Sequence, residues 1–131
     1  MYLYIYMKTL LEIFEDMSNE KIIHVTSPDV GEKIKTEGFK AIKNDIDYKY
    51  YSEFGSKGIY FYNNIRLVQQ YAYFLKDKLK LNSVYLIYCE APINIIQYND
   101  KKEDGLFINT ENLALIKIIN IKNINRIGEL Y

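Results

Sequence analysis

The chain after residue 82 constrains the fold most, because it breaks into a succession of short apolar runs, each of strand length. Turn-forming residues separate these runs: Pro92, the charged turn NDKKEDG and the polar stretch TEN. Strands in this order predict mainly antiparallel pairing. The four strand candidates are SVYLIYCEA (83–91), INIIQY (93–98), GLFIN (105–109) and ALIKIINI (114–121).

The earlier part of the chain predicts helices inserted between strands. KIIHVTS (21–27) is β-branched and apolar, as suits a strand that is buried on both faces. Ser27 ends this run, and Pro28 and Asp29 follow it. This order is typical of a helix start, with an N-cap, a proline in the first turn and an acid near the positive end of the helix dipole. We expect a helix from Pro28 to Glu37, with Gly38 as its C-terminal stop.

A second strand and a second helix follow. GIYFYNN (58–64) predicts a strand whose alternation places Tyr60 and Tyr62 on one face. The helix predicted for residues 65–79 carries an apolar stripe at steps of three and four, with Tyr71 at the edge of this stripe. Residues 39–57 between the two units have no sustained period and predict a long loop. The stripe consists of Ile65, Val68, Ala72, Leu75 and Leu79.

These elements predict an α+β fold with a mainly antiparallel β core and two or three helices. The chain of 131 residues contains no Pro-, Gly- or Ser-rich linker, so we expect one domain over residues 1–131. Residues 1–20 are expected to form an N-terminal segment that packs on this domain, as an amphipathic helix or a helix-capped strand. Their unbroken apolar part is too short to span a bilayer, so we expect no membrane partner.

Composition excludes several classes of function. Lys plus Arg and Asp plus Glu both number 17, so no overall basic charge attracts nucleic acid. Cys89 is the single cysteine and lies in an apolar run, which indicates a buried thiol and a reducing, cytoplasmic compartment. One histidine and one cysteine far apart in the sequence predict no metal site, and no glycine-rich phosphate loop is present.

The only histidine, His24, ends the first strand and could by itself be a structural or a functional residue. Its neighbours in sequence make the functional interpretation stronger. IIHVTSPDVGEKIKTEGF is followed by SKGIYFYNN, then by Tyr71 eleven residues after Tyr60, then by EDGLFINTENLALIKIINI. In this order the chain, over roughly residues 21–122, resembles the ADP-ribosyltransferase superfamily, in the branch that includes the poly(ADP-ribose) polymerases and related bacterial toxins.

The resemblance implies a split, mainly antiparallel core and NAD as co-substrate. It implies that His24 hydrogen-bonds the nicotinamide-side ribose, that the Val25 backbone holds the nicotinamide amide, and that the rings of Tyr60 and Tyr71 sandwich the nicotinamide. A cationic nicotinamide on an aromatic face gains about 0.5–2 kcal/mol of cation–π attraction. The remaining cofactor-binding residues that the resemblance implies are Thr26 and Gly58.

The same resemblance implies a catalytic carboxylate before the GLFIN strand, acting with His24 and Tyr60. Asp104 is the first candidate, Asp100 the second and Glu103 the third; in an extended strand the side chains at 103 and 104 face opposite ways. Such a carboxylate holds a ribose hydroxyl and stabilises the positive charge that grows on the anomeric carbon. Aspartate where the polymerases have glutamate favours transfer of a single ADP-ribose.

We therefore expect a mono-ADP-ribosyltransferase that acts as a toxin, a phage-type effector or a resistance enzyme. The favoured acceptor is a protein; a small molecule such as an antibiotic comes second and nucleic acid third. We expect the protein to be a monomer. Two alternatives remain open: an NAD glycohydrolase, and an inactive module of the same fold that binds NAD, ADP-ribose or a protein. An RNA 2′-phosphotransferase is disfavoured, because Arg66 and Arg126 are the only arginines.

Overall fold

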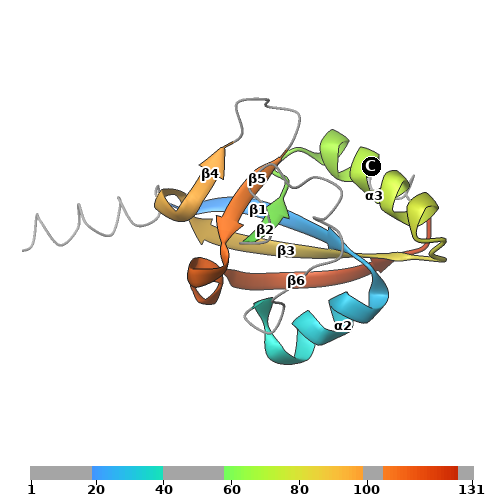
Figure 1. Ribbon diagram of the computed structural model, residues 1–131, viewed down its shortest axis with the longest axis horizontal. Coiled ribbons are helices and arrows are strands. Elements are labelled where there is room, and N and C mark those ends of the chain that lie inside the picture. Colours follow the sequence, from blue (N-terminus) through green and yellow to red (C-terminus); the bar gives the residue numbers. More distant parts are fainter. Residues whose placement is uncertain (1–18, 40–57, 99–104, 127–131) are drawn as a thin grey trace, which may run out of the picture.

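The computed structural model describes residues 19–39, 58–98 and 105–126. Figure 1 shows two small sheets that cross near the centre, with one helix on each side of the longer strands. The elements, in chain order, are β1 (Asn19–Thr26), α2 (Pro28–Glu37), β2 (Gly58–Phe61), α3 (Ile65–Lys78), β3 (Val84–Pro92), the 3-10 helix η3 (Ile93–Ile95), β4 (Ile96–Tyr98), β5 (Leu106–Asn109), the 3-10 helix η4 (Thr110–Leu115) and β6 (Lys117–Ile124).

The strands form two antiparallel sheets of three strands each. The first sheet has the order β1-β3-β6 and the second has the order β2-β5-β4. One isolated bridge joins them, in which Ile23 N donates to Tyr62 O at 2.7 Å and Tyr62 N donates to Ile23 O at 2.8 Å. The predicted α+β class with a split, antiparallel core is confirmed.

Side chains pack on both faces of the first sheet. Leu86 of β3 packs under α3 with Val68 and Leu75, whereas the next residue, Ile87, faces the other way and packs with Ile34 of α2. The second sheet also packs on the α2 side, through residues such as Ile59, Phe61 and Ile108. Alternate residues of a strand point to opposite faces, so an apolar run without alternation is what a strand buried on both sides requires.

The first helix lies where the sequence predicts it. α2 begins at Pro28 and ends at Glu37, and Gly38 follows with φ of 78° while its N–H donates to Ile34 O at 2.7 Å. This left-handed conformation favours glycine, which has no Cβ to clash with the backbone. Ser27 occupies the N-cap position, but its side chain makes no capping hydrogen bond.

The second helix corrects two expectations. Asn64 caps α3, because its side-chain oxygen accepts from Arg66 N at 2.8 Å. Ile65 is 41% exposed and is not a core residue, whereas Tyr71 is 6% exposed and belongs to the core. The buried face is centred on Val68 and Leu75, and at about 100° per residue Tyr71 lies closer to that centre than Ile65 does.

Two of the four later strands begin later than the sequence suggests: β4 is shorter than expected, whereas β6 keeps a length of 8 residues and is shifted toward the C-terminus. The first half of INIIQY is η3, so only residues 96–98 form β4. The first two residues of ALIKIINI complete η4, and β6 begins at Lys117. A short apolar stretch does not distinguish a 3-10 turn from a strand, because a few residues are too short to show whether the period is three or two.

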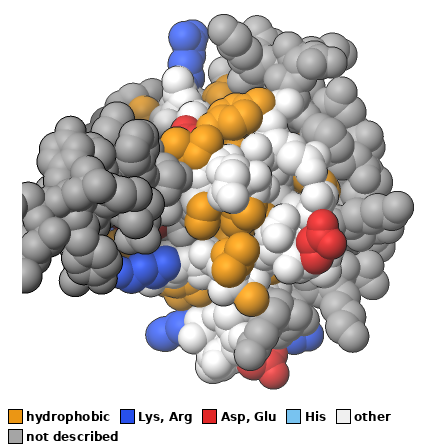
Figure 2. All heavy atoms as spheres, turned by 90° about the vertical axis from the view of Figure 1, so that its left-hand side faces the viewer, with side chains coloured by type: hydrophobic (Ala, Val, Ile, Leu, Met, Phe, Trp, Pro, Cys, Tyr) orange, Lys and Arg blue, Asp and Glu red, His pale blue; other side chains and the backbone are white. Residues whose placement is uncertain are grey.

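Part of the apolar surface stays open. On the side of the molecule where η3 and β4 lie, hydrophobic side chains gather at the centre of the visible face (Figure 2). Ile93 of η3 is 41% exposed and Tyr98 of β4 is 53% exposed. Among the described residues, no helix has both the length and the apolar character needed to cross a membrane.

The N-terminal segment and the long loop fall mostly outside the described residues. Residues 1–18 and 40–57 are not described, so the predicted packing segment and loop stay predictions. Phe39, the first residue of the predicted loop, is 2% exposed and belongs to the core on the α2 side.

Candidate functional site

His24 links the two sheets through its side chain. Its Nδ1 lies 2.8 Å from the backbone oxygen of Tyr60 on β2. Because a carbonyl oxygen can only accept, Nδ1 carries the hydrogen in this bond. The ring is 2% exposed and lies between Phe39, at 5.7 Å between ring centroids, and Phe61, at 5.3 Å. The predicted histidine and the predicted first tyrosine are therefore brought together, through the tyrosine backbone.

The backbone of Val25 faces the line along which the two sheets diverge. Ile23 directs its N–H and C=O to Tyr62 of β2, and β1 pairs with β3 along its whole length without a register shift. In an antiparallel ladder, the backbone groups of alternate residues point to opposite edges. The N–H and C=O of Val25 therefore point to the β2 side, where, among the described residues, the bridge at Ile23 is isolated and no ladder continues.

The side-chain hydroxyl of Thr26 is buried and makes no hydrogen bond to the described residues. Its side chain is 0% exposed, and among the residues that the structure describes nothing hydrogen-bonds its Oγ1. Thr26 is two residues from His24, so the two side chains project from the same face of β1. A buried hydroxyl without a partner costs about 1–3 kcal/mol, which a bound ligand atom would recover.

We call the group formed by His24, Val25, Thr26 and Tyr60 the junction. It gathers an imidazole, a buried hydroxyl and a strand edge whose backbone groups make no hydrogen bond to other described residues, close to the bridge that joins the two sheets. Hydrogen-bond donors and acceptors that are already fixed in place can recognise an amide and a ribose hydroxyl without further ordering.

The two predicted nicotinamide-stacking tyrosines are buried. Tyr60 is 4% exposed and packs edge-on against Phe107 of β5, with ring centroids 5.2 Å apart. Tyr71 packs against Tyr62 at 5.3 Å and against Phe74 at 6.1 Å. A nicotinamide ring can reach Tyr60 and Tyr71 only if these rings separate from their present neighbours.

Gly58, a predicted cofactor-binding residue, has a clear packing role. A Cβ at this position would lie 2.2 Å from Ile108 O and 2.5 Å from the Phe107 ring. The glycine is thus required for the close approach of β2 and β5, whether or not it also contacts a cofactor.

The three candidate carboxylates, Asp100, Glu103 and Asp104, lie outside the described residues. Gly105, which follows them, has φ of 84° and leads into β5. A Cβ on Gly105 would lie 2.8 Å from both Phe61 O and the Tyr62 ring, so the chain re-enters the described core beside the end of β2.

Sequence reasoning missed the aromatic residues that surround the junction. Tyr62 faces Tyr71, and Phe39 and Phe61 enclose the His24 ring. The alternation of GIYFYNN already placed Tyr62 on the same face as Tyr60, so Tyr62 could have been identified as a site neighbour. Phe39 gave no such signal, because it stands at the end of a helix with no periodic pattern after it.

In the part of the chain that the structure describes, Cys89 does not extend the site as a reactive group. Cys89 is 1% exposed, and burial raises the pKa of its thiol well above the ordinary value, so a nucleophilic thiolate is disfavoured there. Within the described ranges, no three His, Cys, Asp or Glu side chains lie close enough together to hold a metal ion. Comparison of the chain with protein-family models, curated proteins and solved structures finds no match.

Proposed function

We propose that the protein is a mono-ADP-ribosyltransferase that binds NAD at the junction. One observation carries this proposal: the His24 ring is hydrogen-bonded to the Tyr60 backbone where the two sheets diverge, and the backbone N–H and C=O of Val25 face the same side. These are the residues to which the resemblance assigns the ribose, the nicotinamide ring and the nicotinamide amide.

Each group at the junction has a role that fits its chemistry. With Nδ1 donating to Tyr60 O, the opposite ring nitrogen of His24 is the one that contacts a ribose hydroxyl. The N–H and C=O of Val25 match the carbonyl and amino groups of a carboxamide. Thr26 Oγ1 supplies a further buried hydroxyl for NAD, which is consistent with its lack of a partner among the described residues.

The reaction breaks the bond between the ribose anomeric carbon and the nicotinamide nitrogen. The electron pair of that bond leaves with nicotinamide, and positive charge develops on the anomeric carbon. A carboxylate from Asp104, Asp100 or Glu103 stabilises this charge. A lone pair of the acceptor then forms the new bond to the anomeric carbon, and the acceptor loses its proton. The favoured acceptor is a protein side chain; with water as acceptor, the same chemistry is NAD hydrolysis.

Nicotinamide stacking requires a local rearrangement of aromatic rings. Tyr71 must separate from Tyr62, which costs the aromatic contact between them, about 0.5–1.5 kcal/mol. Cation–π attraction to the nicotinamide, about 0.5–2 kcal/mol, offsets that cost. The stacking is therefore close to neutral in energy, and the fixed polar groups of the junction carry the binding.

The first experiment measures nicotinamide release from NAD by the purified protein, with and without a cell lysate as the source of acceptor. Asp104→Asn, Asp100→Asn and Glu103→Gln are tested singly, beside Thr26→Val, which keeps the side-chain shape and removes Oγ1. Asp77→Asn is the matched control, because Asp77 is an exposed carboxylate on α3 that pairs only loosely with Lys80, at 3.9 Å.

We expect the wild type and Asp77→Asn to release nicotinamide at equal rates. One of the three carboxylate variants should release nicotinamide at least about a hundredfold more slowly. Thr26→Val should raise the KM for NAD. Retention of full release by all three carboxylate variants would refute the mechanism. Absence of release together with saturable binding of NAD or ADP-ribose would identify an inactive binding module instead.

A further inference from the structure

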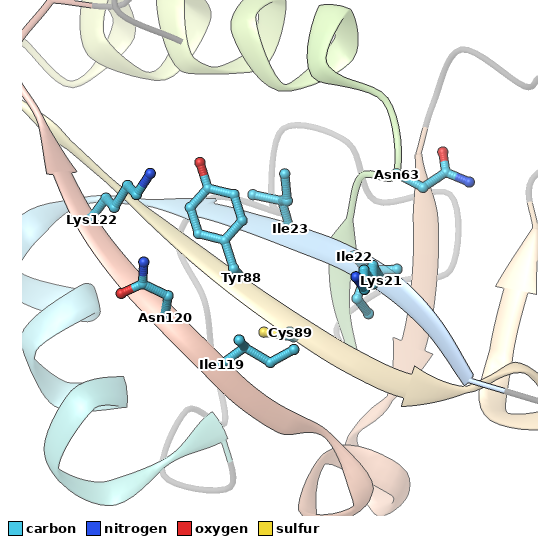
Figure 3. Close-up of a pocket in the computed structure, with 9 residues that line it drawn as sticks. All are labelled: Lys21, Ile22, Ile23, Asn63, Tyr88, Cys89, Ile119, Asn120 and Lys122. Carbon is cyan, nitrogen blue, oxygen red and sulfur yellow. The ribbon is translucent and has the colours of Figure 1, made fainter. Parts of the chain in front are cut away.

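A second recognition surface lies on the first sheet, away from the junction. It is a cavity of about 410 Å³ over β1, β3 and β6, next to the start of α3. Figure 3 shows Ile23 and Tyr88 pointing toward the α3 side of the sheet, with Asn63 above them on the segment that leads into the helix. Volumes of this size are typical of small-molecule sites.

The side chains of this cavity combine an apolar wall with positive charge. Ile23 and Tyr88 form the apolar part, and Lys21 and Lys122 carry the charges. Lys122 Nζ lies 5.3 Å from the centre of the Tyr88 ring, which holds the ammonium over the wall. The amides of Asn63 and Asn120 add hydrogen-bond donors and acceptors, and none of the lining residues is acidic.

Two carboxylates of the described residues lie near the cavity, Glu20 and Glu90. Glu20 accepts from Asn63 Nδ2 at 2.8 Å and from the Tyr98 hydroxyl at 2.5 Å. Glu90 stands opposite Lys21 in the β1–β3 ladder, whereas Lys122 stands opposite the apolar Leu86 in the β3–β6 ladder. The positive potential of the cavity is therefore greatest at its Lys122 end.

The cavity does not belong to the junction. His24 and Thr26 project from one face of β1, and Lys21 and Ile23 project from the other, because side chains alternate along a strand. A molecule in the cavity would lie across β1 from the His24 ring and would not compete for the groups that the junction offers.

We propose that this cavity binds a small molecule that joins a flat apolar group to an anionic group such as a phosphate. The flat group lies against Ile23 and Tyr88, and the anion reaches Lys122, with Asn120 donating a further hydrogen bond. Charge-assisted hydrogen bonds between an ammonium and a phosphate are the strong, orienting contacts of such a site. The observations that support this proposal do not involve NAD turnover at the junction.

The test uses 1-naphthyl phosphate as the probe, followed by NMR on the ¹⁵N-labelled full chain. 1-Naphthol and inorganic phosphate, each alone, separate the apolar and anionic halves of the probe. Lys122→Gln removes the charge at an exposed position, and Lys117→Gln is the matched control, because Lys117 is an exposed lysine of the same strand that does not line the cavity.

We expect the probe to shift the amide signals of Lys21, Ile23, Tyr88 and Lys122, with a Kd at least tenfold lower than either half gives. Lys122→Gln should raise this Kd at least fivefold, while Lys117→Gln leaves it unchanged. Absence of shifts at the cavity, equal binding by phosphate alone, or equal weakening by Lys117→Gln would each overturn the proposal. An unchanged circular dichroism spectrum of Lys122→Gln shows that the variant is folded.

Discussion

Replacement of His24 separates its structural role from its proposed role in NAD binding. The amide nitrogen of asparagine is attached to Cγ, as Nδ1 of histidine is. In His24→Asn it can therefore still donate to Tyr60 O, while the position of the far ring nitrogen is lost. His24→Ala loses both the bond to Tyr60 O and the far ring nitrogen. In His24→Gln the longer side chain places its amide near the position of Nε2 but loses the bond to Tyr60 O.

The expected energies follow from the buried setting of the ring. In His24→Ala the backbone oxygen of Tyr60 loses its bond to Nδ1, which costs about 1–3 kcal/mol. Loss of the ring contacts with Phe39 and Phe61 costs about a further 1–2 kcal/mol. His24→Asn suffers only the second loss, so it should be more stable than His24→Ala by about 1–3 kcal/mol.

The assay is urea unfolding at pH 7.5, followed by circular dichroism, with nicotinamide release measured on the same preparations. We expect His24→Asn to be stable under the assay conditions and yet to release nicotinamide at least about a hundredfold more slowly than the wild type. Equal stability of His24→Asn and His24→Ala would show that the bond to Tyr60 does not hold the sheets together. Full activity of His24→Asn would show that the far ring nitrogen has no part in NAD binding.

Three further predictions follow from local contacts. Asn64→Ala removes the cap that accepts from Arg66 N and should lower the free energy of unfolding by about 1 kcal/mol in urea titrations; an unchanged midpoint would contradict the capping role. The hydrogen bond to Glu20 raises the pKa of Tyr98 from 10.0 to about 12, so the folded state holds this proton more tightly than the unfolded state does. Its contribution to stability is therefore complete below pH 10 and is lost as the pH rises through 12, and Tyr98→Phe should show a smaller fall in stability over that interval than the wild type. Cys89 should react with iodoacetamide only after unfolding, because burial raises the pKa of its thiol; fast labelling of the native protein, measured by mass spectrometry, would contradict its burial.

Local chemistry made much of the fold predictable. The Ser27–Pro28 start and the Gly38 stop predict α2 to the residue, because both ends are set by backbone preferences that depend on adjacent residues alone. The length of β4 was not predictable in this way. η3 takes up the residues after Pro92, and this depends on where the chain must turn to reach the second sheet.

The candidate site also has a part that the sequence predicts and a part that depends on tertiary structure. The order of His24, Tyr60 and Tyr71 in the sequence indicates which residues to examine, and the bond from His24 to the Tyr60 backbone brings the first two together. The partner of Tyr71 was not predictable from spacing alone. Tyr62 packs on it because the bridge to Ile23 draws the end of β2 under α3, a tertiary arrangement that no helical period encodes.

The Ile23–Tyr62 bridge connects the two proposed binding sites physically. Ile23 lines the cavity on one face of β1, and its backbone holds Tyr62, whose ring packs on Tyr71. The proposed stacking of nicotinamide on Tyr71 separates the Tyr71 and Tyr62 rings, and a shift of Tyr62 would strain the bridge that also positions Ile23. A ligand in the cavity that favours the present position of Ile23 therefore opposes this shift, so by linkage it should weaken NAD binding and NAD should weaken its binding by the same factor.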